Sequence, residues 1–348
     1  MNLRAHLLAG QVIPAHPLAL DGQRRFSERH QRALSRYYFA AGTGGIAVGV
    51  HSTQFEIRQP RHKLLRPVLE LAASTVAEEL RTTPRDYAMI AGICGQTSQA
   101  IKEAELARTL GYHAGLVSMA AYKSEPEEVI LQHIMTVAKT IPVIGFYLQP
   151  AVGGRVFSYA FWRKFAEIPE VVAVKIAPFN RYQTIDVVRA VAASGRDDVA
   201  LYTGNDDTIV TDLLSPFTVG NAGRKVIRRI VGGLLGHWGV WTHAAVKLFH
   251  EAQRAAVAPQ IDASWLVRAN AVTDMNAALF DAANRFHGCI PGILEVLRRQ
   301  GLVETAHCLN PDEVLSRGQA EELTRVSAAY PELIDDSFVT QHLNHWLR

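Results

Sequence analysis

A lysine interrupts an otherwise apolar run of residues, VVAVKIA, at positions 171–177. Pro169 and Pro178 bound this run, which is typical of a parallel strand that is covered on both faces. Burying an ammonium group is costly unless the group is paired or loses its proton. A desolvated lysine with a lowered pKa is the nucleophile that forms Schiff bases with carbonyl substrates, so Lys175 is the first candidate for catalysis. The alternative is a strand-end lysine whose ammonium reaches solvent or pairs with a carboxylate.

Tyr147 lies in a second apolar run, PVIGFYL, at residues 142–148. Imine formation and carbon–carbon cleavage both move protons at a buried carbonyl or hydroxyl, and a phenol can give and take a proton. Tyr147 is therefore interpreted as the general acid and base that works beside Lys175. The alternative is an aromatic side chain that only fills the barrel.

The rest of the chain must position these two residues, and its pattern indicates a closed barrel. Buried-strand runs alternate with amphipathic helical segments, and the strand runs lie at residues 12–20, 44–50, 88–95, 114–120, 142–148, 171–177, 199–204 and 232–236. Eight strand–helix units in about 250 residues favour an α/β fold of the (β/α)8 TIM-barrel type. An open doubly wound sheet is less consistent with the sequence, because no GxGxxG turn follows the first strand.

Two segments do not fit a bare barrel. FTVGNAGRKVIRRIV, at residues 217–231, contains two alternating stretches around Asn221-Ala222-Gly223, which predicts an added β-hairpin before the eighth strand. Beyond about residue 258 the chain continues as three or four helical segments. The predicted organisation is therefore a barrel over residues 1–258 and a C-terminal helical region, packed on the barrel, over residues 259–348.

Functional groups of such barrels come from the carboxyl ends of the strands and the loops that follow. Polar residues gather at these positions in the sequence, and the predicted site consists of Lys175, Tyr147, Tyr122, His51, Ser52, Thr53, Gly204, Asn205, Asp206 and His237. No strand-end set of His, Asp or Glu has a recognised metal-ligand spacing, so we expect no metal.

Composition excludes several classes of function. The 36 basic and 33 acidic residues leave a net charge of +3 and are scattered, which argues against nucleic acid or an anionic membrane as partner. The three cysteines are too few and too dispersed for a disulfide framework, so a reducing compartment, the cytoplasm, is expected. No apolar run has membrane-spanning length, and the first residues contain too short an apolar segment for a signal peptide.

The sequence resembles the dihydrodipicolinate synthase and N-acetylneuraminate lyase family of class I aldolases between about residues 12 and 302. The interval from Tyr147 to Lys175 equals the interval between the signature tyrosine and the Schiff-base lysine of the family. AGTGGIAVGVHSTQFEI is similar to the family segment GxxGIxVxGTTGEFxxL, and VSMAAYKSEPEE is similar to VTPYYNKPxxE. VALYTGNDD is similar to LYNGYDE of the lyase branch.

The resemblance implies roles for several of these residues. Lys175 would form the imine without an external cofactor, His51 and Ser52 would hold the keto-acid carboxylate, and the segment after Gly204 would bind substrate hydroxyls. Tyr122 would correspond to the tyrosine that reaches into a neighbouring subunit, in a homotetramer built as a dimer of dimers.

Departures from the family pattern bear on the substrate. His51 replaces the first hydroxyl residue of the GTTGE motif, while Thr53 and Gln54 replace its glycine and glutamate. Val152 stands where the synthase branch has an arginine that grips the carboxylate of the second substrate, which argues against a lysine-biosynthesis synthase. Whether His51 or Arg155 replaces the missing carboxylate contacts is left open by the sequence.

The leading hypothesis is a Schiff-base lyase or aldolase that cleaves or condenses pyruvate or another 2-oxo acid, with a lysine imine as electron sink. One alternative is a sugar-acid dehydratase that uses the same imine. A second, of a different class, is a catalytically inactive family member that acts as a binding or oligomeric protein.

Overall fold

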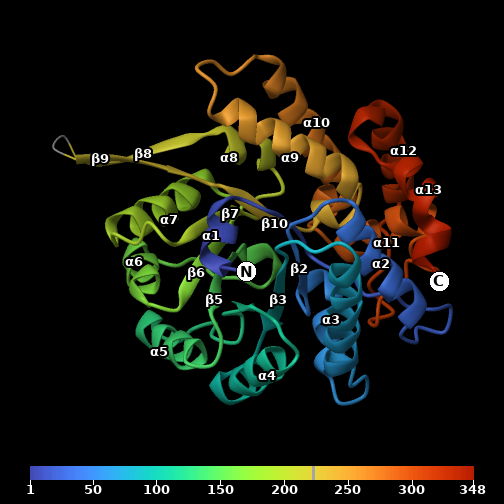
Figure 1. Ribbon diagram of the computed structural model, residues 1–348, viewed down its shortest axis with the longest axis horizontal. Coiled ribbons are helices and arrows are strands. Elements are labelled where there is room, and N and C mark those ends of the chain that lie inside the picture. Colours follow the sequence, from blue (N-terminus) through green and yellow to red (C-terminus); the bar gives the residue numbers. More distant parts are fainter. Residues whose placement is uncertain (222–223) are drawn as a thin grey trace.

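The computed structural model of the protein describes residues 1–221 and 224–348. Eight parallel strands form its centre in the order β1, β10, β7, β6, β5, β4, β3, β2, and helices surround them (Figure 1). An isolated parallel bridge between Ala15 and Ala47 joins the segments of the first and last strands of this order. The sheet thereby closes on itself, which confirms the predicted (β/α)8 barrel.

Strands and helices alternate as the sequence pattern predicts. The barrel strands are β1 (Val12–Pro14), β2 (Gly45–Val48), β3 (Ala88–Ile93), β4 (Ala114–Val117), β5 (Val143–Leu148), β6 (Val171–Ala177), β7 (Ala200–Thr203) and β10 (Gly232–Leu235). The helices outside them are α2 (Glu28–Ala40), α3 (Leu65–Thr82), α4 (Thr97–Thr109), α5 (Glu127–Ala138), α6 (Tyr159–Glu167), α7 (Arg181–Ala193), α8 (Ile209–Leu214) and α9 (Thr242–Ala256). Strand residues are buried on both faces, because side chains fill the barrel inside and helices cover it outside.

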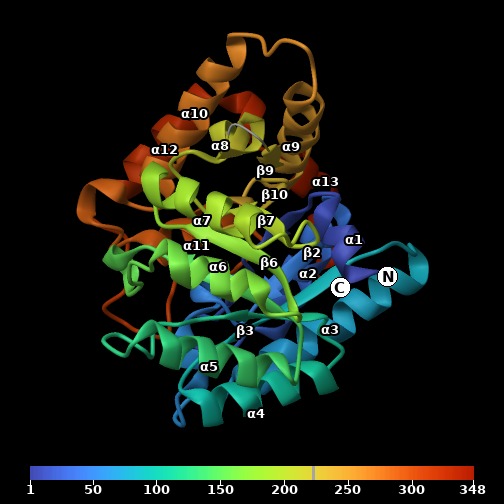
Figure 2. The same ribbon diagram turned by 90° about the vertical axis from the view of Figure 1, so that its left-hand side faces the viewer.

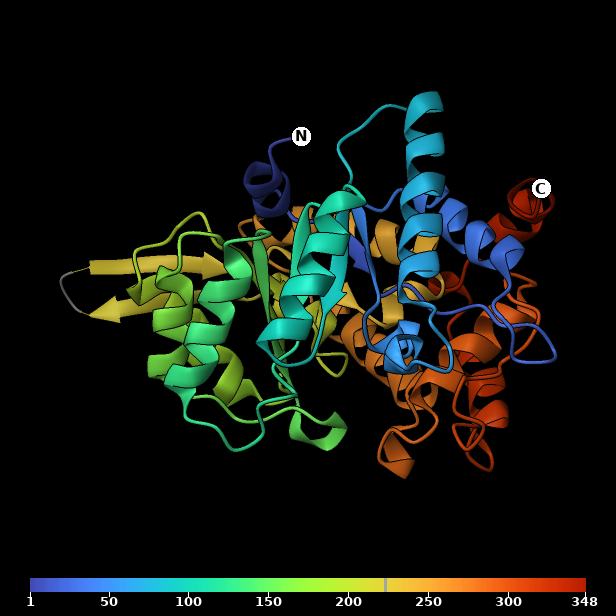
Figure 3. The same cartoon turned by 90° about the horizontal axis from the view of Figure 1, so that it is seen from below.

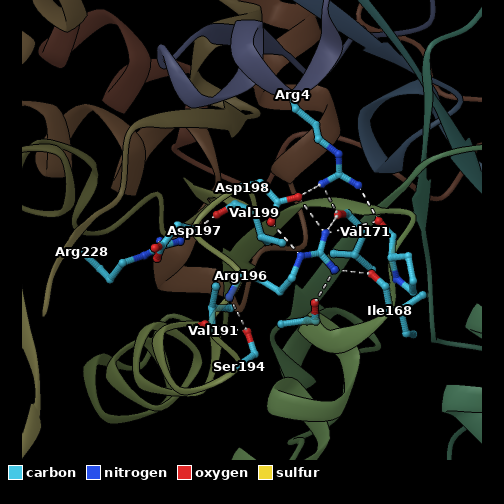
Figure 4. Close-up of polar contacts among 12 residues, drawn as sticks. Arg4, Ile168, Val171, Val191, Ser194, Arg196, Asp197, Asp198, Val199 and Arg228 are labelled. Carbon is cyan, nitrogen blue, oxygen red and sulfur yellow. Dashed lines mark hydrogen bonds and ion pairs between the residues drawn. The ribbon is translucent and has the colours of Figure 1, made fainter.

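A short helix that the sequence pattern did not indicate, α1 (Leu3–Leu8), precedes the first strand. Leu7 packs in the apolar cluster inside the barrel, and its carbonyl accepts a hydrogen bond of 2.8 Å from the Tyr202 hydroxyl. Arg4 donates to the Val171 carbonyl at 2.9 Å and to Asp198 at 2.7 Å, in a network that Arg196 joins (Figure 4). These contacts hold α1 against the amino-terminal end of the barrel, opposite the end where chemistry is expected.

The added hairpin is confirmed. Strands β8 (Pro216–Asn221) and β9 (Arg224–Arg229) pair antiparallel in a separate two-stranded sheet that projects from the barrel wall (Figures 1 and 3). Arg228 anchors its base by donating to Asp197 at 2.9 Å and to the Val199 carbonyl at 2.8 Å. The predicted turn at Asn221-Ala222-Gly223 falls on residues 222 and 223, which lie outside the described residues.

Four further helices form the C-terminal region: α10 (Ser264–Leu279), α11 (Cys289–Arg299), α12 (Gln319–Ala329) and α13 (Asp336–Trp346). They lie beside the barrel, with α10 next to α8 and α13 next to α2 (Figures 1 and 2). The Tyr37 hydroxyl donates to Asp335 at 2.7 Å, and Arg36 donates to the Trp346 carbonyl at 2.9 Å. One hydrophobic cluster includes residues of both regions, so the division at residue 258 stays a prediction. Over the described part of the chain, no helix combines the length and the apolar character needed to cross a bilayer.

Candidate active site

A cavity opens at the carboxyl ends of the barrel strands and contains about 670 Å³ of empty space, part of it continuous with solvent. Strand ends and the loops after them supply one part of its wall: Ala15, Val50, His51, Ser52, Phe146, Leu148, Gln149, Val152, Lys175, Ala177, Phe179, Gly204, Asp206 and Gly236. The C-terminal region supplies the rest: Phe280, Phe286, Cys289 and Ile293. Of the ten predicted site residues, the structure brings Lys175, His51, Ser52, Gly204 and Asp206 to this cavity.

Lys175 is the amine nucleophile in this cavity. Its side chain is only 9% exposed, and burial lowers the pKa of the ammonium, while the Asp206 carboxylate partly opposes that shift. Gly204 makes room for the lysine, because a Cβ at this position would lie 2.7 Å from Lys175 Cε and 2.8 Å from Ala177 Cβ. The lysine therefore extends past a backbone that only glycine can provide.

Asp206 is the candidate for the acid–base group that imine chemistry requires. Its Oδ1 is buried without a hydrogen-bond partner, although part of the residue reaches solvent. Burial raises the pKa of this carboxyl well above its ordinary value, and the Lys175 charge acts in the opposite direction. The loop that carries it is held by α10, because Asn276 Nδ2 donates to the Asp206 carbonyl at 2.6 Å. Each of the two groups therefore shifts the pKa of the other within the same cavity.

His51 and Ser52 line the cavity at the start of a short 3-10 helix, His51–Thr53. Burial and the nearby Lys175 charge lower the pKa of His51 to about 4, so the imidazole is neutral and has one N–H to donate. The Ser52 hydroxyl donates to the Ala15 carbonyl at 2.8 Å. Ser52 can therefore donate to a ligand only if it breaks its hydrogen bond to Ala15. His51 can donate its N–H to a ligand without breaking another hydrogen bond.

Tyr147 does not reach the cavity, which differs from the expectation. Its hydroxyl accepts a hydrogen bond from the Phe157 N–H at 3.4 Å, and its ring packs against Trp162 at 5.0 Å between centroids. It belongs to the cluster between strands and helices, while Phe146 belongs to the cluster inside the barrel. Tyr147 thus fills space between the barrel strands and the helices. The alternative named from the sequence was also a space-filling aromatic side chain, but one inside the barrel.

A β-bulge explains this change of face. Val143 at the start of β5 pairs with Val171, and Tyr147 would pair with Lys175 if that register persisted. Instead, the next residue of β5, Ile144, pairs with Ala173, so β6 contains an extra residue at this point. Because the register shifts by one, Lys175 pairs with Phe146. Such a shift turns every later side chain to the other face.

Thr53 and Asn205 support loops and do not line the cavity. The Thr53 hydroxyl accepts from the Gly49 N–H at 3.0 Å and donates to the His16 carbonyl at 2.6 Å. Asn205 accepts from the Phe179 N–H at 3.0 Å and donates to Asp212 at 2.9 Å. Their hydrogen-bonding groups are used within the protein, so we revise both from ligand contacts to positioning residues.

Tyr122, His237 and Arg155 also lie outside the cavity wall. The Tyr122 hydroxyl accepts from the Thr97 N–H at 3.1 Å in its own chain, and its expected reach into a neighbouring subunit stays a prediction. His237 is 3% exposed, and burial lowers the pKa of its imidazole to about 4. Arg155 donates to the carbonyls of Tyr122 at 3.1 Å and Glu125 at 2.8 Å, which leaves His51 as the stronger candidate for a carboxylate contact.

Sequence patterns gave no role to the aromatic and apolar residues that cap the cavity. Phe280, Phe286, Cys289 and Ile293 lie far beyond Lys175 in the chain and belong to no recognised motif. Two signals were present: aromatic residues close to a helix end, and the Asn-Arg-Phe-His-Gly stretch at 284–288, which contains turn formers. Within residues 1–221 and 224–348 there is no group of three His, Cys, Asp or Glu side chains arranged to hold a metal ion.

Comparisons with known proteins indicate a family for this chain. The family model described as "Dihydrodipicolinate synthetase family" matches residues 10–328. A curated 4-hydroxy-tetrahydrodipicolinate synthase of Ralstonia nicotianae is 28% identical over 211 residues, which are 60% of this chain and 65% of that protein. The chain thus matches slightly less than two thirds of that relative's length. Enzymes of this family are lyases and synthases of the class I aldolase type that use a lysine Schiff base and no external cofactor.

Solved structures show the same fold at low identity. The dihydrodipicolinate synthase of Bacteroides thetaiotaomicron superposes with a TM-score of 0.73 at 16% identity, over 92% of this chain and 98% of that chain. The N-acetylneuraminate lyase of Fusobacterium nucleatum superposes with a TM-score of 0.70 at 16% identity, over 94% of this chain and all of the other. Both a synthase and a lyase thus share the fold of this chain over the whole barrel, at the same identity.

Proposed function

Because the chain belongs to the dihydrodipicolinate synthetase family, we propose that it is a Schiff-base lyase or aldolase in which Lys175 forms an imine with a 2-oxo acid. The observation that carries the proposal is the pairing, in one cavity, of a buried lysine of lowered pKa with a carboxyl of raised pKa. Such a pair supplies both a nucleophilic amine and a proton carrier near neutral pH.

The cleavage steps follow from these two groups. The neutral Lys175 amine adds to the ketone carbon of a 4-hydroxy-2-oxo acid to give a carbinolamine, which takes up a proton and loses water to leave a protonated imine. The Asp206 carboxylate takes the proton of the 4-hydroxyl as the bond between C3 and C4 breaks, and the electron pair of that bond moves into the imine to form an enamine. An aldehyde leaves. C3 then takes that proton from Asp206, which restores the carboxylate, and water hydrolyses the imine to release pyruvate and the free lysine.

His51 is assigned to the carboxylate of the substrate. Its neutral imidazole has a free N–H to donate, and it lines the cavity together with Lys175. Ser52 is assigned a secondary contact, because its hydroxyl is engaged with Ala15. A hydrogen bond to an ionised carboxylate is stronger than one between neutral groups, which favours this contact for holding the keto acid.

Trapping with borohydride tests this proposal. Purified protein is incubated with pyruvate and sodium borohydride, and its intact mass is compared with that of Lys175→Ala treated in the same way. The expected result is one reduced adduct on the wild type and none on the variant. Absence of an adduct across a panel of 2-oxo acids would favour a binding protein without catalysis. Analysis of the products from 2-oxo acids would then separate cleavage from dehydration.

A further inference from the structure

The geometry of the cavity assigns a substrate class, and we propose that it selects 2-oxo acids whose group distal to the keto carbon is apolar, either aromatic or branched alkyl. This inference rests on the proposed imine chemistry at Lys175. It concerns the part of the cavity wall that the C-terminal region supplies.

The polar side chains of the cavity wall come from the strand ends and the residues just after them, which also contribute apolar side chains such as Val50 and Phe146. His51, Ser52, Lys175 and Asp206 lie at or just after strand ends, where the keto acid would react. The C-terminal region contributes only apolar side chains to the wall, and these are Phe280, Phe286, Cys289 and Ile293. Burial raises the pKa of the Cys289 thiol, so this side chain stays neutral.

The loop after β5 extends the apolar part of the wall. Leu148, the last residue of β5, and Val152 in the loop line the cavity, with Gln149 as a polar exception between them. Gln149 is 8% exposed and is followed by Pro150, which begins a short 3-10 helix. A single amide on this loop can bond one polar group of a substrate, whereas a chain of hydroxyls needs several partners.

The apolar cap packs directly on the barrel. A Cβ at Gly236, the residue after β10, would lie 3.0 Å from the Phe280 ring and 3.7 Å from Ile293 Cδ1. Phe286 meets Phe179, which follows β6, edge to face with 5.8 Å between ring centroids. The cap and the strand ends therefore form one continuous enclosure, and a substrate group that extends from the imine must pass between them.

A polar network outside the cavity holds the cap in place. Asp281 is 4% exposed and accepts hydrogen bonds from the Gly288 N–H at 2.9 Å and from Ser316 at 2.5 Å. Gln319 donates to the Gly288 carbonyl at 3.0 Å. Asp281 and Phe286 have φ values of 58° and 65°, in the left-handed region that side chains rarely adopt. The network maintains this strained loop, whose effect is to present two aromatic rings to the cavity.

The apolar side chains of the cap determine which distal groups of a substrate are favoured. A hydroxyl or carboxylate on the distal group would lose its water without gaining a partner on Phe280, Phe286 or Ile293, whereas an apolar group is favoured by removal of its surface from water. A hydrophobic pocket disfavours an isosteric substrate that adds one hydroxyl by only about 10²-fold, so a substrate with several hydroxyls is disfavoured more strongly. Sugar acids, with several hydroxyls, are the class most disfavoured.

One trapping experiment tests the inference separately from the imine mechanism. Full-length protein is titrated with pyruvate, 4-phenyl-2-oxobutanoate and 2-oxo-3-deoxygluconate, and the borohydride adduct is measured by intact mass. We expect pyruvate to form an adduct, and half-maximal trapping by the phenyl compound at a concentration at least about 10-fold below that of the sugar acid. A pyruvate adduct combined with equal or tighter trapping of the sugar acid would overturn the substrate class and leave the imine intact. Failure to trap pyruvate would overturn both.

Ile293 offers a matched pair of variants. Valine and threonine at position 293 have nearly the same shape, and the variants Ile293→Val and Ile293→Thr differ by one hydroxyl. We expect the valine variant to keep the preference for the phenyl compound and the threonine variant to reduce it about 3-fold or more, with folding of both checked by thermal unfolding. Equal preferences in two folded variants would contradict a role for the cap in selection.

Discussion

Lys175 pairs with Phe146 across β5 and β6, and its Nζ lies 4.4 Å from the centroid of the Phe146 ring. An aromatic face attracts a cation but offers no proton to a reacting group. The cavity therefore contains an aromatic ring where the sequence comparison led us to expect a phenol, and proton transfer must come from another residue. Asp206 is the group whose position and pKa meet that need.

Tyr147→Phe is expected to change turnover by less than about 3-fold, because the hydroxyl bonds to the Phe157 N–H outside the cavity. The variant should lose about 1 kcal/mol of unfolding free energy with that hydrogen bond. Steady-state kinetics and denaturant unfolding measure the two effects. A loss of roughly 10²-fold or more in turnover would show that the phenol does transfer protons during reaction.

Asp206→Asn should slow turnover by roughly 10²- to 10⁴-fold while the pyruvate adduct still forms, because the amide cannot carry the proton. The carboxylate raises the pKa of Lys175, so its removal should lower that pKa further. Neutral lysine is the nucleophile, and the rate of trapping should therefore reach its plateau at a lower pH in the variant. Rates measured from pH 6 to pH 10 test the shift.

Asp207→Asn is the matched control for that experiment. Asp207 is the next residue in the same loop but is exposed and does not line the cavity. We expect its trapping profile to coincide with that of the wild type. An equal shift in both variants would mean that any charge in the loop changes the pKa of Lys175, and it would contradict the specific effect assigned to Asp206.

Gly204→Ala should reduce the rate of adduct formation at least about 10-fold, because the new methyl group would lie 2.7 Å from Lys175 Cε. Overpacking of this kind costs typically about 1–3 kcal/mol of stability. Gly22→Ala is the control, since the nearest atom to its Cβ is a Glu304 oxygen at 3.8 Å. Wild-type trapping in a folded Gly204→Ala protein would contradict the proposed course of the lysine side chain.

Stability should fall as the pH decreases from about 6.5 to about 4. Burial lowers the pKa values of His16 and His237 to about 4, so between these limits the unfolded chain binds more protons than the folded one. Each imidazole then removes about 1.4 kcal/mol per pH unit. Urea unfolding at several pH values measures the slope, and His16→Gln should reduce it by the share of one imidazole. A slope that is unchanged in this variant would contradict the assignment to His16.

Local patterns were sufficient to predict the barrel. The alternation of apolar strand runs with helices implies βα units, and burial on both faces follows from runs such as VVAVKIA. The same run identified Lys175, because a charge inside it needs an explanation. Helix α1 was missed since six residues are too short to show a helical period.

The face of Tyr147 could not be predicted from spacing. Its interval to Lys175 along the chain is the same with or without a bulge, but the extra residue on β6 decides which of Phe146 and Tyr147 points inward. Bulges depend on how the two strands pair and twist, which sequence distance does not encode. Likewise, Phe286 lines the cavity from a loop that Asp281 holds through hydrogen bonds from Gly288 and Ser316, contacts that spacing along the chain does not encode.

Location of the adduct by peptide mapping tests the central claim most directly. Wild-type protein and Asp206→Asn are reduced with borohydride in the presence of pyruvate, digested, and analysed by tandem mass spectrometry. We predict that the reduced pyruvyl group lies on Lys175 in both proteins. Modification spread over exposed lysines, or a protein that remains unmodified at Lys175, would contradict the assignment of this residue as the imine-forming nucleophile.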